Sequence, residues 1–114
     1  MDSKKICYTC DLIDKPELIE KYKNYHSKDN TWPEITKSIR DSGIVNMEIY
    51  LLANRMFMIM EVDETFTPER KQKMDADNPK VQEWENLMWE FQQAPPGAKK
   101  GEKWLPMERI FKLE

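Results

Sequence analysis

The chain has 114 residues, of which 39% are hydrophobic and 34% are charged, and its formal net charge is -3. This length favours one domain, 1–114, with a single core, and the four residues each of Trp, Tyr and Phe are typical of a folded chain. The 21 acidic and 18 basic residues are mixed along the chain, which argues against nucleic acid as a partner, and no apolar run approaches the ~20 residues that cross a bilayer.

The N-terminus predicts a cytoplasmic protein. Met1 to Lys5 lead directly into a segment typical of a strand, without the apolar stretch and cleavage site of a signal peptide. Two cysteines beside eight methionines fit a reducing compartment better than a disulfide scaffold.

The first half of the chain predicts a strand, a broken helix and a hairpin. A strand over Ile6 to Leu12 stops before Pro16, where a helix begins. A second helical piece follows Thr31, which has a capping-box spacing to Glu34, and ends at Gly43. Two strands, over 44–52 and 56–62, flank a short turn at 53–55 and form the hairpin.

The second half predicts helical segments and a final strand. Thr67-Pro68 and Asn78-Pro79 each combine a capping residue with a first-turn proline. The second pair starts a helix with one apolar stripe, formed by Val81, Trp84, Leu87, Met88 and Phe91. A loop over 94–101 then precedes a strand over 104–113, in which Pro106 is tolerated only near the start or on an edge.

The element order β-α-β-β-α-β predicts a ferredoxin-like α+β fold, in which helices cover one face of a four-stranded antiparallel sheet. The strands over 44–52 and 56–62 carry large apolar residues at both parities. The second sheet face therefore needs a cover, and a homodimer is the simplest one.

The single histidine, His26, is the best candidate for acid/base chemistry, since its unperturbed pKa suits proton transfer in both directions near neutral pH. Tyr22 lies one helical turn earlier on the same face, so a phenol and an imidazole converge on one place. The spacing alone also fits a histidine that is merely solvated or hydrogen-bonded at a helix end.

Aromatic rings and carboxylates supply further candidates for binding. Indole rings are common platforms for the apolar face of a sugar, although Trp84 by its position also suits the core. Glu48 and Glu61 lie inside apolar strands, where a charge is costly unless it is paired, bound to a polar ligand or exposed at an edge. The four tryptophans are Trp32, Trp84, Trp89 and Trp104.

Cys7 and Cys10 have the spacing of a metal or redox motif, but residues three apart on a strand point to opposite faces. No second pair completes a metal site, and the sequence has no glycine-rich phosphate loop or serine nucleophile motif. We therefore expect neither a metal nor another cofactor.

Several segments in register resemble the L-rhamnose mutarotase family. They are Glu20 to His26, Trp32-Pro33-Glu34, Gly43 to Leu51, Val81 to Trp84 and Met107 to Phe111. The resemblance implies a dimeric ferredoxin-like enzyme without metal that interconverts the α and β anomers of a 6-deoxyhexose, L-rhamnose or L-fucose.

By the same resemblance, His26 looks like the proton donor, Tyr22 like a sugar-binding tyrosine and Trp84 like the first of two tryptophans beside the substrate. Glu85 stands where the rhamnose enzymes have the second tryptophan, and Met47 where they have a tyrosine.

We include both differing positions in the predicted sugar site, together with Tyr50 and Trp32. Other segments, among them 10–12, 77–79, 87–89 and 101–104, look closer to a branch associated with L-fucose, which favours L-fucose slightly.

Two other functions are compatible with the predicted fold, because one fold hosts many activities. Small dimeric α+β-barrel monooxygenases and non-catalytic sugar-binding modules share this architecture. The motifs, which extend over nearly the whole chain, favour the mutarotase.

Overall fold

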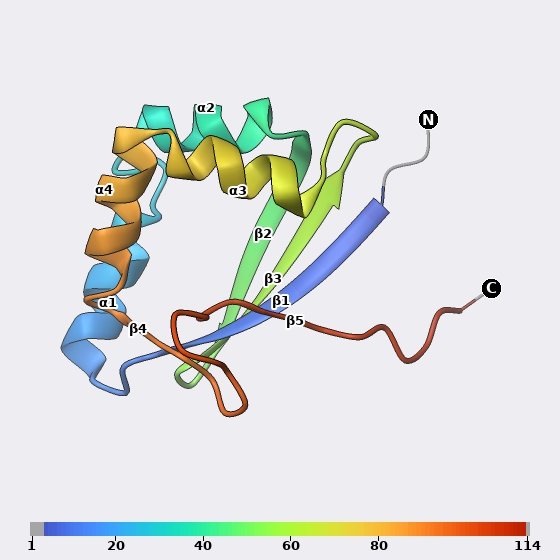
Figure 1. The fold of residues 1–114 in the computed structure, drawn as a ribbon. Coiled ribbons are helices and arrows are strands. Elements are labelled where there is room, and N and C mark those ends of the chain that lie inside the picture. Colours follow the sequence, from blue (N-terminus) through green and yellow to red (C-terminus); the bar gives the residue numbers. More distant parts are fainter. Residues whose placement is uncertain (1–3, 114) are drawn as a thin grey trace.

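The computed structural model, which describes residues 4–113, has an antiparallel sheet covered on one face by helices (Figure 1). The ends of the predicted domain 1–114, residues 1–3 and 114, lie outside the described part. The strands are β1 (Lys4–Leu12), β2 (Ile44–Leu52), β3 (Arg55–Val62), β4 (Gln92–Gln93) and β5 (Leu105–Pro106). The helices are α1 (Pro16–Tyr25), α2 (Pro33–Asp41), α3 (Pro68–Ala76) and α4 (Pro79–Met88).

The strand order β2-β3-β1-β4 is that of the predicted ferredoxin-like fold. β1 pairs with β3 from Lys4 opposite Val62 to Asp11 opposite Arg55. β2 pairs with β3 along its length, with a bulge between Ile44 and Asn46. The predicted hairpin and the antiparallel α+β class are therefore confirmed.

The prediction of one continuous final strand over 104–113 is wrong. Two short strands, β4 and β5, share the edge of β1 that faces away from β3, and residues 94–104 loop out between them. Beyond Pro106, which has no N–H to donate, the backbone N–H of Met107 still donates to the carbonyl of Cys7 at 2.8 Å. The chain then leaves the sheet, and Figure 1 shows this C-terminal segment extending away from the body.

The break between α1 and α2 is confirmed, but the capping box predicted at Thr31 is wrong. The residue that caps α2 is Trp32, which makes no side-chain capping bond. The Thr31 hydroxyl instead donates to the carbonyl of Ser27 at 2.8 Å, and the amide of Asn30 donates to the carbonyl of Asn24 at 3.0 Å. These polar side chains stabilise the turn at the end of α1.

Both caps predicted for the second half of the chain are confirmed. The Thr67 hydroxyl accepts a hydrogen bond from the backbone of Arg70 at 3.0 Å, at the start of α3. Asn78 accepts from the backbone N–H groups of Lys80 and Val81, at the start of α4. No helix within residues 4–113 has the length and apolar character of a membrane span.

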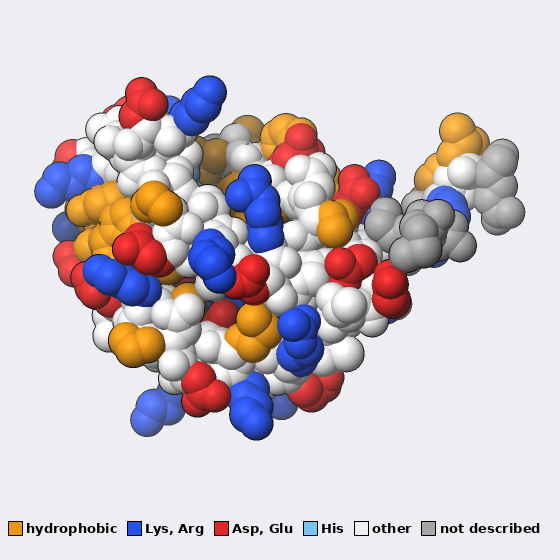
Figure 2. All heavy atoms as spheres, turned by 90° about the horizontal axis from the view of Figure 1, so that it is seen from above, with side chains coloured by type: hydrophobic (Ala, Val, Ile, Leu, Met, Phe, Trp, Pro, Cys, Tyr) orange, Lys and Arg blue, Asp and Glu red, His pale blue; other side chains and the backbone are white. Residues whose placement is uncertain are grey.

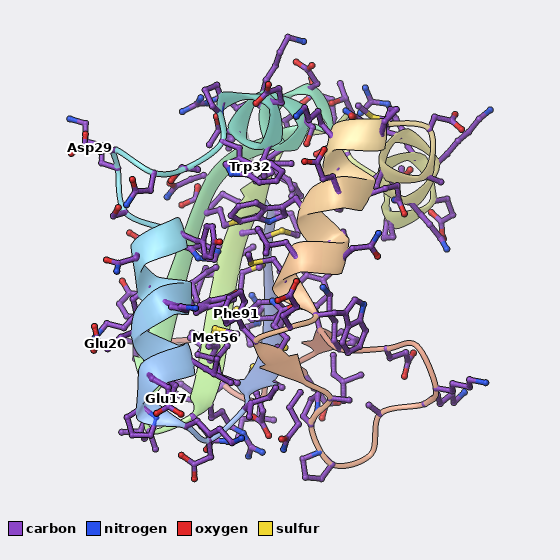
Figure 3. All side chains as sticks on the ribbon, turned by 90° about the vertical axis from the view of Figure 1, so that its left-hand side faces the viewer. Glu17, Glu20, Asp29, Trp32, Met56 and Phe91 are labelled. Carbon is purple, nitrogen blue, oxygen red and sulfur yellow. The ribbon has the colours of Figure 1, made fainter. Side chains whose placement is uncertain are left out.

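The core lies between the helices and the sheet. Met56, Met88, Leu12 and Cys10 are almost fully buried there, together with Phe91. In Figure 3, Met56 and Phe91 lie on the inner side of α1, whereas Glu20 lies on its outer side. The aromatic and sulfur-containing side chains of α1, α4 and the sheet thus form one apolar layer.

Within residues 4–113, the helices cover only one face of the sheet (Figure 1). Tyr50 and Leu52 of β2 are 56% and 82% exposed, and the C-terminal segment exposes Ile110 and Phe111. The surface over α2 and α3 is more polar. Positive and negative side chains are interspersed there, as Figure 2 shows from above. Apolar exposure is therefore concentrated on β2 and the C-terminal segment.

Candidate active site

A cavity of about 760 Å³ lies between the sheet and the helices. This volume is within the range of small-molecule sites. One end is lined by Tyr22, His26, Trp84, Met88, Gln92 and Trp104, and methionines of β2 and β3 line the adjoining wall. The other end is lined mainly by side chains of α2, α3 and β2.

His26 lies directly after the last turn of α1, where its backbone caps the helix. Its Nδ1 is 2.8 Å from the carbonyl oxygen of Tyr22. Because a carbonyl can only accept, Nδ1 carries the proton in this contact, and Nε2 is left as the nitrogen that can take a proton. Local helix geometry therefore selects the tautomer of the imidazole.

The ring of His26 packs against two aromatic rings of the cavity. Its centroid is 4.3 Å from that of Tyr22 and 5.5 Å from that of Trp84. Burial against these rings lowers the pKa of His26 below its usual value of 6.5, and the hydrogen bond to the Tyr22 carbonyl acts against this effect. The residue is open to solvent on its other side, which limits the lowering. At neutral pH the imidazole is therefore an uncharged base.

The Tyr22 hydroxyl is held inside the cavity wall. Tyr22 is only 4% exposed, and its oxygen accepts a hydrogen bond from Nε2 of Gln92 at 3.0 Å. Burial raises the pKa of Tyr22, against the smaller effect of this hydrogen bond, so the phenol keeps its proton at neutral pH. Tyr22 is thus an uncharged donor or acceptor beside the imidazole.

Two tryptophans line the same end of the cavity. Trp84 comes from the inner face of α4, and Trp104 comes from the chain immediately before β5. Trp32 is not among the residues that line the cavity, but its ring packs against that of Trp84 with centroids 5.0 Å apart. In Figure 3, Trp32 lies just below α2. It therefore supports Trp84 from behind.

The structure brings Met47 into the cavity wall but not Glu85 or Tyr50. The carboxylate of Glu85 pairs with the Lys103 ammonium at 2.9 Å, outside the residues that line the cavity. Tyr50 points to the opposite face of the sheet, where its hydroxyl donates to Glu48 at 3.2 Å. In one chain, then, four of the seven predicted site residues meet in the cavity: Tyr22, His26, Met47 and Trp84.

Glu85 nevertheless affects the site indirectly, through its partner Lys103. Lys103, its partner, is 8% exposed, and its ammonium lies 4.9 Å from the centre of the Trp89 ring. These two contacts hold the end of the 94–104 loop against α4. Trp104, the next residue, reaches the cavity from this anchored position.

The two cysteines lie on different faces of β1, as their spacing predicts. Cys10 is in the core, where burial raises the pKa of its thiol to about 12, and Cys7 lies half-buried on the other face. Across residues 4–113, no three His, Cys, Asp or Glu side chains cluster so that they could hold a metal ion.

Gln92 is a cavity residue that is absent from the predicted site. Its side chain is buried, lines the cavity and contacts Tyr22. No motif marks it, because it belongs to a two-residue strand that follows the apolar stripe of α4. One signal could have indicated Gln92. It is a polar residue directly after Phe91, in a segment that the core needs.

Comparisons with known proteins agree along nearly the whole chain. A model of the L-rhamnose mutarotase family matches residues 5–113. An L-fucose mutarotase from Xanthomonas campestris pv. campestris is 42% identical over 113 residues, which cover 99% of this chain and 90% of that protein. A UPF0734 protein of Dictyostelium discoideum is 38% identical, with coverage of 99% and 92%.

Among solved structures, an L-rhamnose mutarotase from Formosa agariphila has a similar fold. The two structures superpose with a TM-score of 0.71, and the match covers 98% of this chain and 100% of the other. Since the sequences are only 23% identical, this comparison supports the architecture alone.

Proposed function

The chain belongs to the L-rhamnose mutarotase family, and on this premise we propose that it interconverts the α and β anomers of L-fucose through acid/base chemistry at His26. The family consists of aldose 1-epimerases, which are isomerases. The single observation that carries the residue assignment is the imidazole of His26, with Nδ1 on the Tyr22 carbonyl, beside a phenol and an indole in one cavity.

Mutarotation needs two proton transfers, one at each of the two oxygens bonded to the anomeric carbon C1. In the proposed reaction, Nε2 of His26 takes the proton of the anomeric hydroxyl while the bond between C1 and the ring oxygen breaks and the ring oxygen gains a proton from a solvent water molecule. Rotation about the C1–C2 bond presents the other face of the aldehyde. On closure the imidazolium returns its proton to the carbonyl oxygen and the ring oxygen gives its proton back to the hydroxide left by the water, so the sum is isomerisation without a cofactor.

The other cavity residues match an uncharged sugar. Trp84 and Trp104 offer aromatic surface to the apolar side of the ring, and Tyr22 offers a hydroxyl for hydrogen bonding. Trp104 thereby fills the role that the resemblance gives to a second tryptophan of α4, since Glu85 pairs with Lys103. Glu85 and Tyr50 do not line the cavity and are not among the proposed sugar contacts.

L-fucose is preferred over L-rhamnose on two grounds. The relative from Xanthomonas, 42% identical, is named for L-fucose. Met47 also lines the cavity where the rhamnose enzymes have a tyrosine, and a thioether cannot make the hydrogen bond of a phenol. A missing partner for a sugar hydroxyl costs about 1–3 kcal/mol, which is enough to change preference between two sugars.

Polarimetry tests the proposed activity. A freshly dissolved single anomer of L-fucose should reach its equilibrium rotation faster with the protein than in buffer, and faster than L-rhamnose relative to the same blank. A non-catalytic sugar-binding module would leave the rate at the blank value. A monooxygenase would consume oxygen with an aromatic substrate, which an oxygen electrode would detect.

We further propose that the protein is a cytoplasmic homodimer. The uncovered sheet face, with Tyr50 and Leu52, and the apolar C-terminal segment support a second copy as the cover. Two free thiols fit a reducing compartment. Light scattering at micromolar concentration should give about twice the chain mass of 13.7 kDa, and a monomer mass would contradict the dimer.

A further inference from the structure

Gln92 is a buried polar residue that the family resemblance does not assign to any role. It is 5% exposed and lines the cavity, and its amide nitrogen donates to the Tyr22 hydroxyl at 3.0 Å. Its other pole, Oε1, is buried and has no hydrogen-bond partner anywhere in residues 4–113. A buried acceptor without a partner destabilises the fold, so its presence calls for an explanation outside stability.

The contact with Gln92 determines what Tyr22 can do. A phenol has one proton, which prefers the plane of the ring, and it accepts hydrogen bonds through its oxygen. Because Nε2 of Gln92 occupies an accepting position of the oxygen, the Tyr22 proton points to the other side of the oxygen. The hydroxyl then serves as a donor to a ligand in the cavity.

A pyranose needs such a donor. Its ring oxygen has no hydrogen and can only accept, and this atom gains a proton in the proposed reaction. If the carboxamide of Gln92 were reversed, Oε1 would take the Tyr22 proton and the phenol would offer only an acceptor. The two orientations therefore differ in whether Tyr22 can bind the ring oxygen.

We propose that Gln92 is a positioning residue that fixes Tyr22 as a hydrogen-bond donor to the sugar. The inference rests on the proposed function, because it assumes that Tyr22 binds the substrate. Gln92 acts only through the phenol. The backbone at this position is fixed, since β4 pairs Gln92 with Leu12 and the adjacent Phe91 carbonyl accepts from the backbone of Ile13 at 2.8 Å.

Gln92→Leu separates this role from a structural one. Leucine removes both the donor and the orphaned acceptor, so the melting temperature should stay equal or rise. The KM for L-fucose should rise about three- to tenfold, since Tyr22 is no longer held as a donor to the sugar in the bound complex. Gln93→Leu, at the exposed neighbouring position of β4, is the matched control and should leave KM unchanged.

Two further variants test the direction of the hydrogen bond. Gln92→Glu replaces the donor Nε2 with an oxygen that can accept the phenol proton and take it away from the sugar, and it should raise KM more than Gln92→Leu does. In a Tyr22→Phe background, Gln92→Leu should have no further effect on KM.

The inference is overturned if Gln92→Leu leaves KM within twofold of the Gln93→Leu control, or if its effect is equally large in the Tyr22→Phe background. It is also overturned if Gln92→Glu behaves as the unmodified protein does. Absence of anomer exchange in the unmodified protein would instead refute the proposed function, so the two failures are distinguishable.

Discussion

His26→Asn is the substitution that best separates proton transfer from helix capping. The amide nitrogen of asparagine can take the place of Nδ1 and donate to the carbonyl of Tyr22, which is 2.8 Å away in the histidine. Asparagine has no group in the place of Nε2 that could accept a proton near neutral pH. The variant therefore keeps the local hydrogen bond and removes the base.

For His26→Asn we expect a large loss of exchange rate and a small loss of stability. Loss of a general acid/base group lowers a rate by about 10²- to 10⁴-fold, which corresponds to roughly 3–5 kcal/mol in the barrier. Stability loses only the packing of the imidazole against Tyr22 and Trp84, at about 0.5–1.5 kcal/mol. For a domain of this size that is a decrease of several degrees in the melting temperature.

The assay measures anomer exchange by polarimetry and unfolding by circular dichroism on the same preparations. Asn24→Ala, an exposed change in the same turn, serves as the control and should retain both properties. Exchange by His26→Asn within tenfold of the unmodified protein, in a folded sample, would remove His26 from the mechanism.

Three further predictions concern pH and backbone geometry. The rate of anomer exchange should fall on the acidic side with a midpoint below pH 6.5, because burial lowers the pKa of His26. In unfolding titrations, the contribution of His26 to the free energy of unfolding should be complete above about pH 6.5. It should be lost as the pH falls through the lowered pKa, because the unfolded chain takes the proton first. Gly43→Ala should lower the free energy of unfolding by about 3 kcal/mol in denaturant titrations, because φ is +100° and a Cβ would lie 2.6 Å from the Thr65 hydroxyl oxygen. Gly97→Ala is the control: its φ is +90°, but a Cβ there would meet open space, so the loss should be only about 1–2 kcal/mol. Ala53→Gly should raise the melting temperature, because Ala53 has φ of 55° in the hairpin turn; an unchanged or lower value would contradict this.

Regular patterns made most of the fold predictable. Val81, Trp84 and Met88 recur at helical spacing and are buried on the inner face of α4, and the capping residues Thr67 and Asn78 act as predicted. The last strand was not predictable in this way. β4 and β5 each pair with β1 over only two residues, and the loop over 94–104 separates them. Neither strand is long enough to show the alternation of apolar and polar residues that would indicate the pairing.

The candidate site was predictable where one helix determines it. The four-residue spacing puts Tyr22 and His26 together, and their ring centroids are 4.3 Å apart. Contacts between distant segments could not be read from spacing. Gln92 meets Tyr22 across 70 positions of the chain, and the pairing of Glu85 with Lys103 depends on how the 94–104 loop folds back.

Saturation-transfer NMR on the unmodified protein tests the central claim most directly. With L-fucose in solution, the anomeric proton of the α form is saturated and the signal of the β form is observed at increasing protein concentration. We predict that the β signal decreases in proportion to protein, and by more than that of L-rhamnose under the same conditions. A β signal that stays at the value in buffer for both sugars would contradict the assignment of this chain as a mutarotase of 6-deoxyhexoses.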